Sequence, residues 1–139
     1  MSNFLIFSSL SPKELEFYEI RLKIALKKAK LTSKGCLLAS TCSKKAYPKM
    51  SICSKDLGSK KLVTLSSFIM YLNDRLSNNK SNYDISHLCG HKNCILFDHL
   101  SFEPHSINIS RVQCHRLKGS NRKCHGHSEN GEDFAACIL

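Results

Sequence analysis

The sequence has no tryptophan, and it has no apolar stretch approaching the roughly 20 residues that a membrane-spanning helix needs. Its N-terminal apolar run, residues 4–7, is too short for the hydrophobic region of a secretory signal and has no basic segment before it. We therefore expect a nuclear or otherwise intracellular compartment, where thiols stay reduced. In such a compartment the cysteines are predicted to be metal ligands or buried thiols, not disulfides.

Internal repeats, low-complexity tails and long linkers are also missing, so the 139 residues are predicted to form a single domain spanning residues 1–139. A chain of this length buries only a modest core, and serine, lysine and asparagine are abundant between its apolar runs. We expect a further source of stability, and the eight cysteines and seven histidines are the obvious candidates.

Acidic residues are scarce. There are 11 aspartates and glutamates against 21 lysines and arginines, which gives a formal net charge of +10. An excess of this size indicates a polyanionic partner, either a nucleic acid or an anionic membrane surface. Charge alone does not choose between these two partners.

Two helices are predicted from the spacing of apolar residues. Ser11 and Glu14 have the spacing of a capping box and Pro12 fits a first turn, so a helix is expected over residues 11–30. We interpret it as an amphipathic helix packed on the domain edge, with contact to DNA as the alternative. The apolar pattern of residues 63–76 predicts a second helix.

Between these helices, residues 36–61 have the composition of a basic β ribbon. Residues 36–40 and 48–53 are predicted to be strands, separated by turns rich in serine and lysine. Six lysines stand in this region against one acidic residue: Lys44, Lys45, Lys49, Lys55, Lys60 and Lys61. A basic antiparallel ribbon can enter a DNA major groove, whereas scattered lysines usually cover a solvated sheet face. Both interpretations stay open at this point.

The last third of the chain carries the most informative pattern, a series of cysteines and histidines. The order is His87-x-Cys89-x4-Cys94-x4-His99-x8-Asn108-x5-Cys114-x9-Cys124-x2-His127-x9-Cys137. Structural zinc takes four nitrogen and sulfur ligands in a tetrahedron. The sulfur and imidazole ligands of this pattern form two consecutive groups, and each group is predicted to hold one zinc ion.

The two predicted zinc sites differ in how completely the pattern defines them. The second site is complete, with the ligands Cys114, Cys124, His127 and Cys137. His125 is the rival of His127 in that site. The first site has only three ligands in the pattern, Cys89, Cys94 and His99. We choose Cys36 as its fourth ligand, because it opens a predicted strand, over Cys42 and Cys53, which are more typical of buried thiols.

The string from His87 through the second ligand group resembles the His-Cys box homing endonucleases, which belong to the wider His-Me finger, or ββα-metal, nucleases. The resemblance covers about residues 36–137 and is most specific over residues 86–137. It implies an α+β fold of small antiparallel sheets with flanking helices, stapled by two zinc ions. In this fold a β-hairpin and the helix after it hold one divalent ion against the scissile phosphate, and this ββα-metal core with its zinc loops is expected over residues 83–139.

The resemblance also implies roles for individual residues. His87 matches the histidine that takes a proton from the attacking water, and Asn108 matches the helix asparagine that coordinates a catalytic Mg²⁺. The chemistry agrees, because imidazole accepts protons near neutral pH and Mg²⁺ binds oxygen ligands while keeping several waters. The expected activity is that of a homing-type endonuclease, which hydrolyses DNA to 5′-phosphate and 3′-hydroxyl ends.

Cations are expected to grip the phosphate beside this centre. Family members place an arginine or other cation before the ββα unit, and Lys60 and Lys61 are the nearest candidates. The metal-binding helix is predicted to have Glu103 in its first turn, so that Arg111 shares a face with Asn108 and reaches a phosphate. A DNA-facing basic stretch is expected from Arg111, Arg116, Lys118, Arg122 and Lys123. We interpret four further histidines as surface residues: His91, His105, His115 and His125.

Two functions from different classes fit this pattern. The first is an active endonuclease on double-stranded DNA, without a membrane partner, acting as a monomer or weak homodimer. The second is a catalytically inactive zinc-stabilised DNA-binding or regulatory protein derived from such a nuclease. The presence of both His87 and Asn108 favours the enzyme.

Overall fold

The computed structural model describes residues 2–40, 46–117 and 123–139, and these form small antiparallel sheets flanked by helices. The helices are α1 (Asn3–Ser8), α2 (Pro12–Lys28), α3 (Leu65–Leu72) and α4 (His105–Arg116), with a 3₁₀ turn at Phe97–His99. The strands pair as β1 (Lys30–Leu31) with β2 (Leu37–Leu38), β3 (Lys49–Ile52) with β4 (Lys61–Thr64), β5 (Tyr83–His87) with β6 (Leu100–Pro104), and β7 (His127–Glu129) with β8 (Glu132–Phe134). The predicted mixed α+β fold is confirmed.

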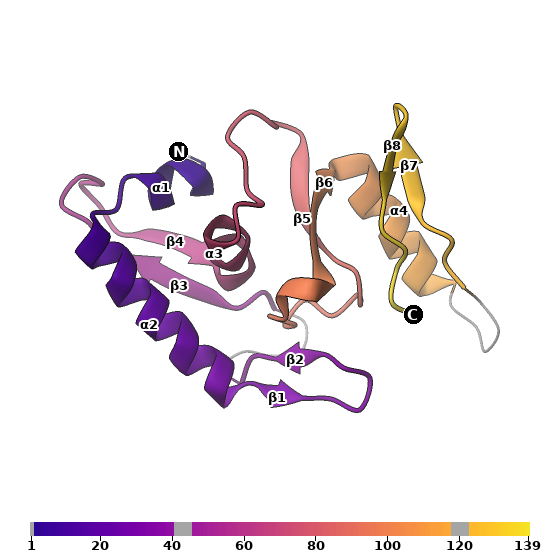
Figure 1. Ribbon diagram of the computed structural model, residues 1–139, viewed down its shortest axis with the longest axis horizontal. Coiled ribbons are helices and arrows are strands. Elements are labelled where there is room, and N and C mark those ends of the chain that lie inside the picture. Colours follow the sequence, from indigo (N-terminus) through magenta and orange to yellow (C-terminus); the bar gives the residue numbers. More distant parts are fainter. Residues whose placement is uncertain (1, 41–45, 118–122) are drawn as a thin grey trace.

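The arrangement places a hairpin-and-helix unit toward the C-terminal end of the molecule. In Figure 1, α2 runs along one side, α3 and the β5–β6 hairpin occupy the middle, and α4 with the β7–β8 hairpin lies at the other side. Strands β5 and β6 pair antiparallel from Tyr83 opposite Pro104 to His87 opposite Leu100. Helix α4 follows β6 directly and contacts both strands, so these three elements form a ββα unit.

Helix α2 begins as its sequence predicts. The Ser11 hydroxyl accepts from the Glu14 amide, and the Glu14 carboxylate accepts from the Ser11 amide, so the capping box is confirmed. Pro12 is the first helical residue, where its missing N–H leaves no helical bond unmade. The helix ends at Lys28, two residues before the predicted end. Helix α1 was not predicted, because six residues are too few to show a helical period.

The second predicted helix is shorter than expected, and the region before it is not one ribbon. Residues 61–64 belong to strand β4, and α3 covers only Leu65–Leu72. Strand β2 pairs with β1 and strand β3 pairs with β4, so the predicted ribbon over residues 36–61 is divided between two sheets. The prediction was wrong on this point because strand pairing depends on tertiary neighbours that periodicity does not reveal. Cys42, Lys44 and Lys45 lie outside the described residues.

The main apolar core lies between the N-terminal helices, α3 and the β3–β4 sheet. Phe7 of α1 packs its ring 5.1 Å from that of Phe68 and 5.2 Å from that of Tyr71, both on or next to the inner face of α3. The Tyr18 hydroxyl of α2 donates to the Cys53 carbonyl at 3.1 Å and accepts from the Cys53 amide at 2.8 Å. These contacts fix α1 to α3 and fix α2 to the end of β3.

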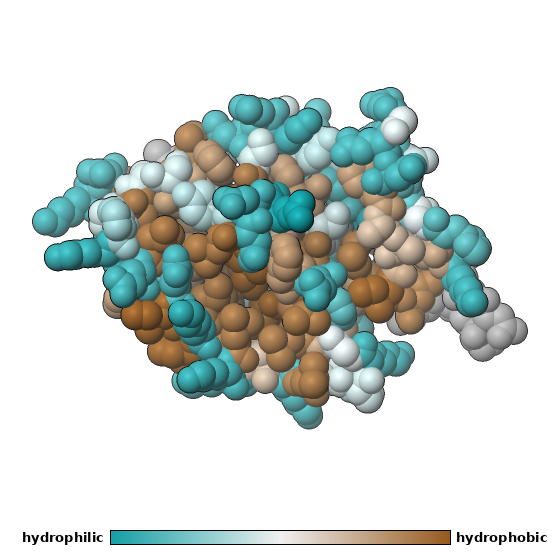
Figure 2. Space-filling model, in the orientation of Figure 1, coloured by the Kyte–Doolittle hydropathy of each residue, from teal (hydrophilic) through white to brown (hydrophobic). Residues whose placement is uncertain are grey.

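The outer face of α2 is less polar than an exposed helix face usually is. Phe17, Ile20 and Ile24 are all about half exposed and recur at helical spacing. Figure 2 shows apolar side chains gathered over the lower left of this view, where α2 crosses in Figure 1. No helix in the described part of the chain is both long enough and apolar enough to cross a membrane.

A buried ion pair joins the β5–β6 hairpin to α4. Glu103 lies in strand β6 rather than in a helical first turn, and it is fully buried. Its carboxylate accepts from Nε and from Nη2 of Arg111, the latter at 2.8 Å, in a bidentate pair. Burial alone would raise the pKa of the Glu103 carboxyl, but the Arg111 guanidinium holds it below its ordinary value. The structure therefore does not support the predicted contact of Arg111 with a phosphate, because this side chain is buried and already paired.

We expect Glu103→Gln to lower the free energy of unfolding by about 3–5 kcal/mol, because the buried guanidinium of Arg111 is left without a counter-charge. Thermal melts of zinc-loaded protein measure this loss. Glu132→Gln, which removes an exposed carboxylate on β8, is the matched control and should stay within about 0.5 kcal/mol of the parent. A Glu103→Gln variant as stable as this control would contradict the assignment.

Candidate metal centres and active site

The first cysteine and histidine cluster joins the β1–β2 hairpin to the loop between β5 and β6. Cys36 follows Gly35, whose positive φ of 85° turns the chain into β2. The cluster is completed by Cys89, Cys94 and His99, and its four ligand atoms all lie within 4.8 Å of one another. The His99 Nδ1 atom lies 3.7 Å from the Cys36 sulfur and 3.6 Å from that of Cys94.

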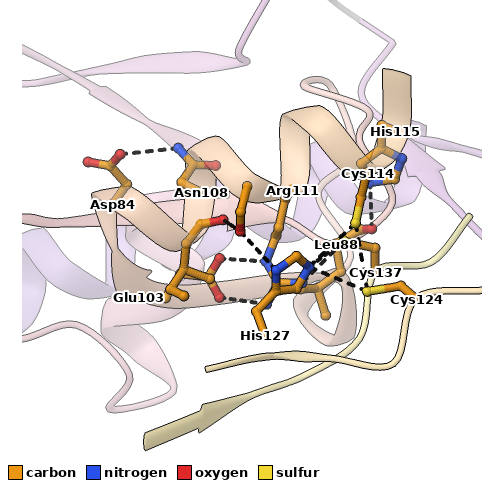
Figure 3. A network of polar contacts seen from close by, with 12 residues as sticks. Asp84, Leu88, Glu103, Asn108, Arg111, Cys114, His115, Cys124, His127 and Cys137 are labelled. Atoms are coloured by element: carbon orange, nitrogen blue, oxygen red, sulfur yellow. Dashed lines mark hydrogen bonds and ion pairs between the residues drawn. The ribbon is translucent and has the colours of Figure 1, made fainter. Parts of the chain in front are cut away.

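The second cluster ties the end of α4 to the C-terminal hairpin. It consists of Cys114, Cys124, His127 and Cys137, again with all four ligand atoms within 4.8 Å of one another. The His127 Nε2 atom lies 3.7, 3.3 and 3.4 Å from the sulfurs of Cys114, Cys124 and Cys137, respectively. The Cys114 and Cys124 sulfurs are 4.0 Å apart. Figure 3 shows these side chains converging beside α4.

Both clusters fit zinc by geometry and by donor type. A tetrahedral zinc with bonds of about 2.3 Å to sulfur and 2.0–2.1 Å to nitrogen separates its ligand atoms by about 3.6–3.8 Å, close to the distances found here. In the first cluster, the hydrogen bond from the Cys89 thiol lowers the pKa of Cys94 to about 4. Three sulfurs and one imidazole are a common structural zinc set. The described part of the chain thus has two zinc sites of the Cys3His type.

The structure also separates the ligands from their rivals. Cys53 is exposed at the end of β3 and belongs to neither cluster, whereas Cys36 occupies the fourth place of the first one. His125 is exposed, and His127 takes the place in the second cluster. Cys42 lies outside the described residues. All seven cysteines that the structure describes are free of disulfide bonds.

His87, the last residue of β5, is held in a defined tautomer. It is buried, and its Nε2 atom lies 3.1 Å from the carbonyl oxygen of Cys94. A carbonyl only accepts, so Nε2 carries the proton and Nδ1 is left as the accepting nitrogen of the neutral ring. Burial lowers the pKa of His87, which favours this neutral form. Because Cys94 is a ligand of the first cluster, that cluster fixes the carbonyl that orients His87.

Asn108 is the fourth residue of α4 and faces Asp84 of β5. Its Nδ2 atom donates to the Asp84 carboxylate at 3.1 Å, which leaves the amide oxygen on the opposite side (Figure 3). An amide oxygen is a ligand that Mg²⁺ accepts, so the side chain is suited to bind a hard cation. The sequence pattern identified Asn108 but gave no sign of its partner Asp84.

His87 and Asn108 line one cavity of about 290 Å³ between β5 and α4. Tyr47 and three cations, Lys92, Arg111 and Arg116, line it too, and of these Arg111 is already paired with Glu103. The Tyr47 ring lies 5.7 Å from the His87 ring, centroid to centroid. The Lys92 ammonium lies 5.3 Å from the centroid of the Tyr47 ring. The prediction missed Tyr47 and Lys92, because only the fold brings their segments to this cavity.

The structure does not bring Lys60 and Lys61 to this cavity. Lys61 pairs with Ile52, whereas Lys49, two residues after Tyr47, pairs with Thr64 at the opposite end of the same hairpin. Three residue steps separate these ends, which corresponds to about 10 Å along the strands. Lys60 and Lys61 therefore occupy the far end of the β3–β4 hairpin from Tyr47.

Further contacts lock α4 onto the second zinc cluster. The His127 Nδ1 atom lies 2.8 Å from the Ser110 hydroxyl, which in turn donates to the Ile107 carbonyl, so the ring presents Nε2 to the metal. Arg111 donates to the Cys137 sulfur at 3.4 Å as well as to Glu103.

His115, predicted to be a surface residue, instead joins α4 to the loop between β5 and β6, which carries ligands of the first cluster. Its Nε2 atom lies 3.0 Å from the Leu88 carbonyl, and its ring packs against Gly90. A Cβ at residue 90 would lie only 2.8 Å from the His115 ring, and the positive φ of 75° also favours glycine there. The sequence gave no signal for this contact, because it depends on how α4 crosses the loop.

We expect purified protein to contain about two zinc equivalents per chain, one for each set of four ligands. Cys36→Ser should reduce this to about one equivalent and lower the melting temperature, because structural zinc contributes folding free energy. Elemental analysis under reducing conditions measures the zinc. Cys53→Ser is the matched control, since this exposed thiol belongs to neither cluster, and it should keep both ions. A parent protein that folds without metal would refute the assignment.

Comparison with known proteins supports the same classification. No curated protein and no solved structure matches the chain. The family model for the zinc-binding loop region of homing endonucleases matches residues 59–139, which is more than half of the chain. The matched segment includes His87, Asn108 and every ligand of the two clusters except Cys36. The chain therefore belongs to the family of the homing-endonuclease zinc-binding loop region.

Proposed function

We propose that this protein is a Mg²⁺-dependent DNA endonuclease in which His87 is the general base and Asn108 holds the catalytic ion. One observation carries the proposal: His87, with its oriented neutral imidazole, and Asn108, with its oriented amide, line the same cavity. Membership of the homing-endonuclease zinc-loop family and the net charge of +10 support a DNA substrate.

His87 takes a proton from the attacking water through Nδ1. The Cys94 carbonyl accepts from Nε2–H, which keeps Nδ1 unprotonated and fixed in direction. The ring of Tyr47 lies against the imidazole and limits its rotation. After the water attacks phosphorus in line, the bond to the 3′-oxygen breaks, and the ends formed are a 5′-phosphate and a 3′-hydroxyl.

Asn108 contributes one oxygen ligand to the ion. Bound Mg²⁺ would stabilise the charge that develops on the phosphate and on the departing 3′-oxygen. The residues fit this role, because the Asn108 amide nitrogen is already bonded to Asp84 and the oxygen is free to coordinate. Helix α4 is anchored by the Glu103–Arg111 pair and by the second zinc cluster, so the position of this oxygen is well defined.

Lys92 and Arg116 are the cations we assign to the scissile phosphate, in place of Lys60 and Lys61. Both line the cavity that holds His87 and Asn108. Lys60 and Lys61 are instead assigned to the flanking duplex, as part of the basic surface of the β3–β4 hairpin. A monomer or weak homodimer remains the prediction for the assembly, and light scattering tests it.

We expect His87→Ala and Asn108→Ala to cut cleavage of supercoiled plasmid by about 10²–10⁴-fold, the usual effect of losing a general base or an equally important catalytic group. Zinc content should stay at the parent value, because neither residue belongs to a zinc cluster. DNA affinity should also survive, since phosphate contacts dominate it. Gel assays with and without Mg²⁺ measure the rates.

His125→Ala and Asn79→Ala are matched controls, because both side chains are exposed and lie outside the cavity. They should cleave like the parent. If the His87 and Asn108 variants also cleave like the parent, the catalytic assignment fails. A parent protein that binds zinc and DNA but never cuts in Mg²⁺ or Mn²⁺ would favour the inactive DNA-binding alternative.

The choice of phosphate-binding cation gives a separate prediction. Arg116→Ala should slow cleavage at saturating DNA by about 10-fold or more, because it removes a charge aimed at the transition state. Lys61→Ala should weaken DNA binding and reduce its salt dependence by about one unit in the log–log slope, with little change in the saturated rate. Equal effects on the saturated rate from the two substitutions would argue against this division of roles.

A further inference from the structure

A carboxylate that no zinc cluster uses lies beside the proposed magnesium ligand. Asp84 is in β5, opposite Glu103 in β6, and its side chain is about one third exposed. The same oxygen, Oδ2, accepts from Asn108 Nδ2 at 3.1 Å and from His105 Nδ1. His105 and Asn108 are three residues apart on α4, so both face β5 and bracket this oxygen.

We propose that Asp84 is a positioning residue that fixes which end of the Asn108 amide is presented to the catalytic cation. This inference rests on the proposed function, because it deepens the role of Asn108. A carboxylate at neutral pH only accepts hydrogen bonds, so the atom facing Asp84 must be the amide nitrogen. The oxygen, the sole metal-binding atom of the side chain, then faces away from Asp84.

Without Asp84, the two orientations of the amide differ little, because its nitrogen and oxygen are almost the same size. A half-turn of χ2 of Asn108 would present an NH₂ group to the cation in place of the oxygen, and this group repels a cation. His105 adds to the effect by holding the Asp84 oxygen in place. Asp84 thereby orients an amide ligand, as outer-shell carboxylates orient metal-bound histidines.

The first test is Asp84→Asn in the full chain, with Asp133→Asn as the matched control. Asp133 is exposed on β8 and its substitution makes the same change in charge. We expect Asp84→Asn to raise the Mg²⁺ concentration for half-maximal plasmid cleavage by about 10–100-fold, the usual effect of losing an outer-shell partner. The rate at saturating Mg²⁺ should return to near the parent value, and zinc content should not change.

A second readout does not depend on cleavage. In the parent, the two Asn108 side-chain amide protons should be well separated in the NMR spectrum and exchange slowly, because one of them is donated to Asp84. Their assignment comes from the spectrum of Asn108→Ala. Asp84→Asn should collapse this separation, and Asp133→Asn should leave it unchanged. If the parent cleaves no DNA, this measurement still tests the contact, so failure of the proposed function is distinguishable from failure of this inference.

A reciprocal exchange guards against a variant that folds poorly. Asn108→Asp alone places two carboxylates side by side, whereas Asp84→Asn combined with Asn108→Asp restores one donor and one acceptor at the same two positions. The double variant should cleave faster than Asn108→Asp alone and melt at a higher temperature. The proposal would be overturned if Asp84→Asn kept the Mg²⁺ dependence of the parent, or if saturating Mg²⁺ did not restore its maximal rate. It would also be overturned if the double variant cleaved no faster than Asn108→Asp.

Discussion

Convergence of soft ligands on two points is the constraint on which this structure depends. The apolar core gathers around α1, α2, α3 and the β3–β4 sheet, while the described part of the C-terminal third contributes only Ile95 and Leu100 to its buried residues. There the chain is held by sulfur and imidazole groups that come from distant parts of the sequence, such as Cys36 with His99, or Cys114 with Cys137. A metal supplies the binding free energy that a core of this size does not.

Each zinc cluster also fixes one side of the candidate active site. The first holds the loop after β5, and its ligand Cys94 provides the carbonyl that sets the tautomer of His87. The second holds α4, which carries Asn108, through Cys114 at the end of the helix and through the Ser110 contact with His127. The proposed base and the proposed metal ligand are therefore positioned by separate anchors on opposite walls of one cavity. This division allows both groups to be rigid in a small domain.

The buried Glu103–Arg111 pair links these two anchors. Glu103 belongs to the hairpin, Arg111 belongs to the helix, and Arg111 also donates to the Cys137 sulfur of the second cluster. Taking a guanidinium and a carboxylate out of water is expensive unless every polar group is matched, and here the geometry is bidentate. The pair specifies how α4 packs across β5 and β6. The pair holds the orientation of the helix, so Arg111, although it lines the candidate active site, is not available to a phosphate.

The sequence by itself determined the chemistry of the chain. Seven of the eight zinc ligands follow from spacing, because soft ligands in a short run are few and their chemistry is local, and the capping box of α2 is equally local. The tertiary structure decided which distant groups meet: the pairing of β2 with β1 rather than with β3, the burial of Arg111, and the placement of Asp84, Tyr47 and Lys92 around His87 and Asn108. A ligand type or a cap is a property of a few neighbouring residues, whereas strand pairing and burial depend on the packing of segments that the sequence keeps far apart.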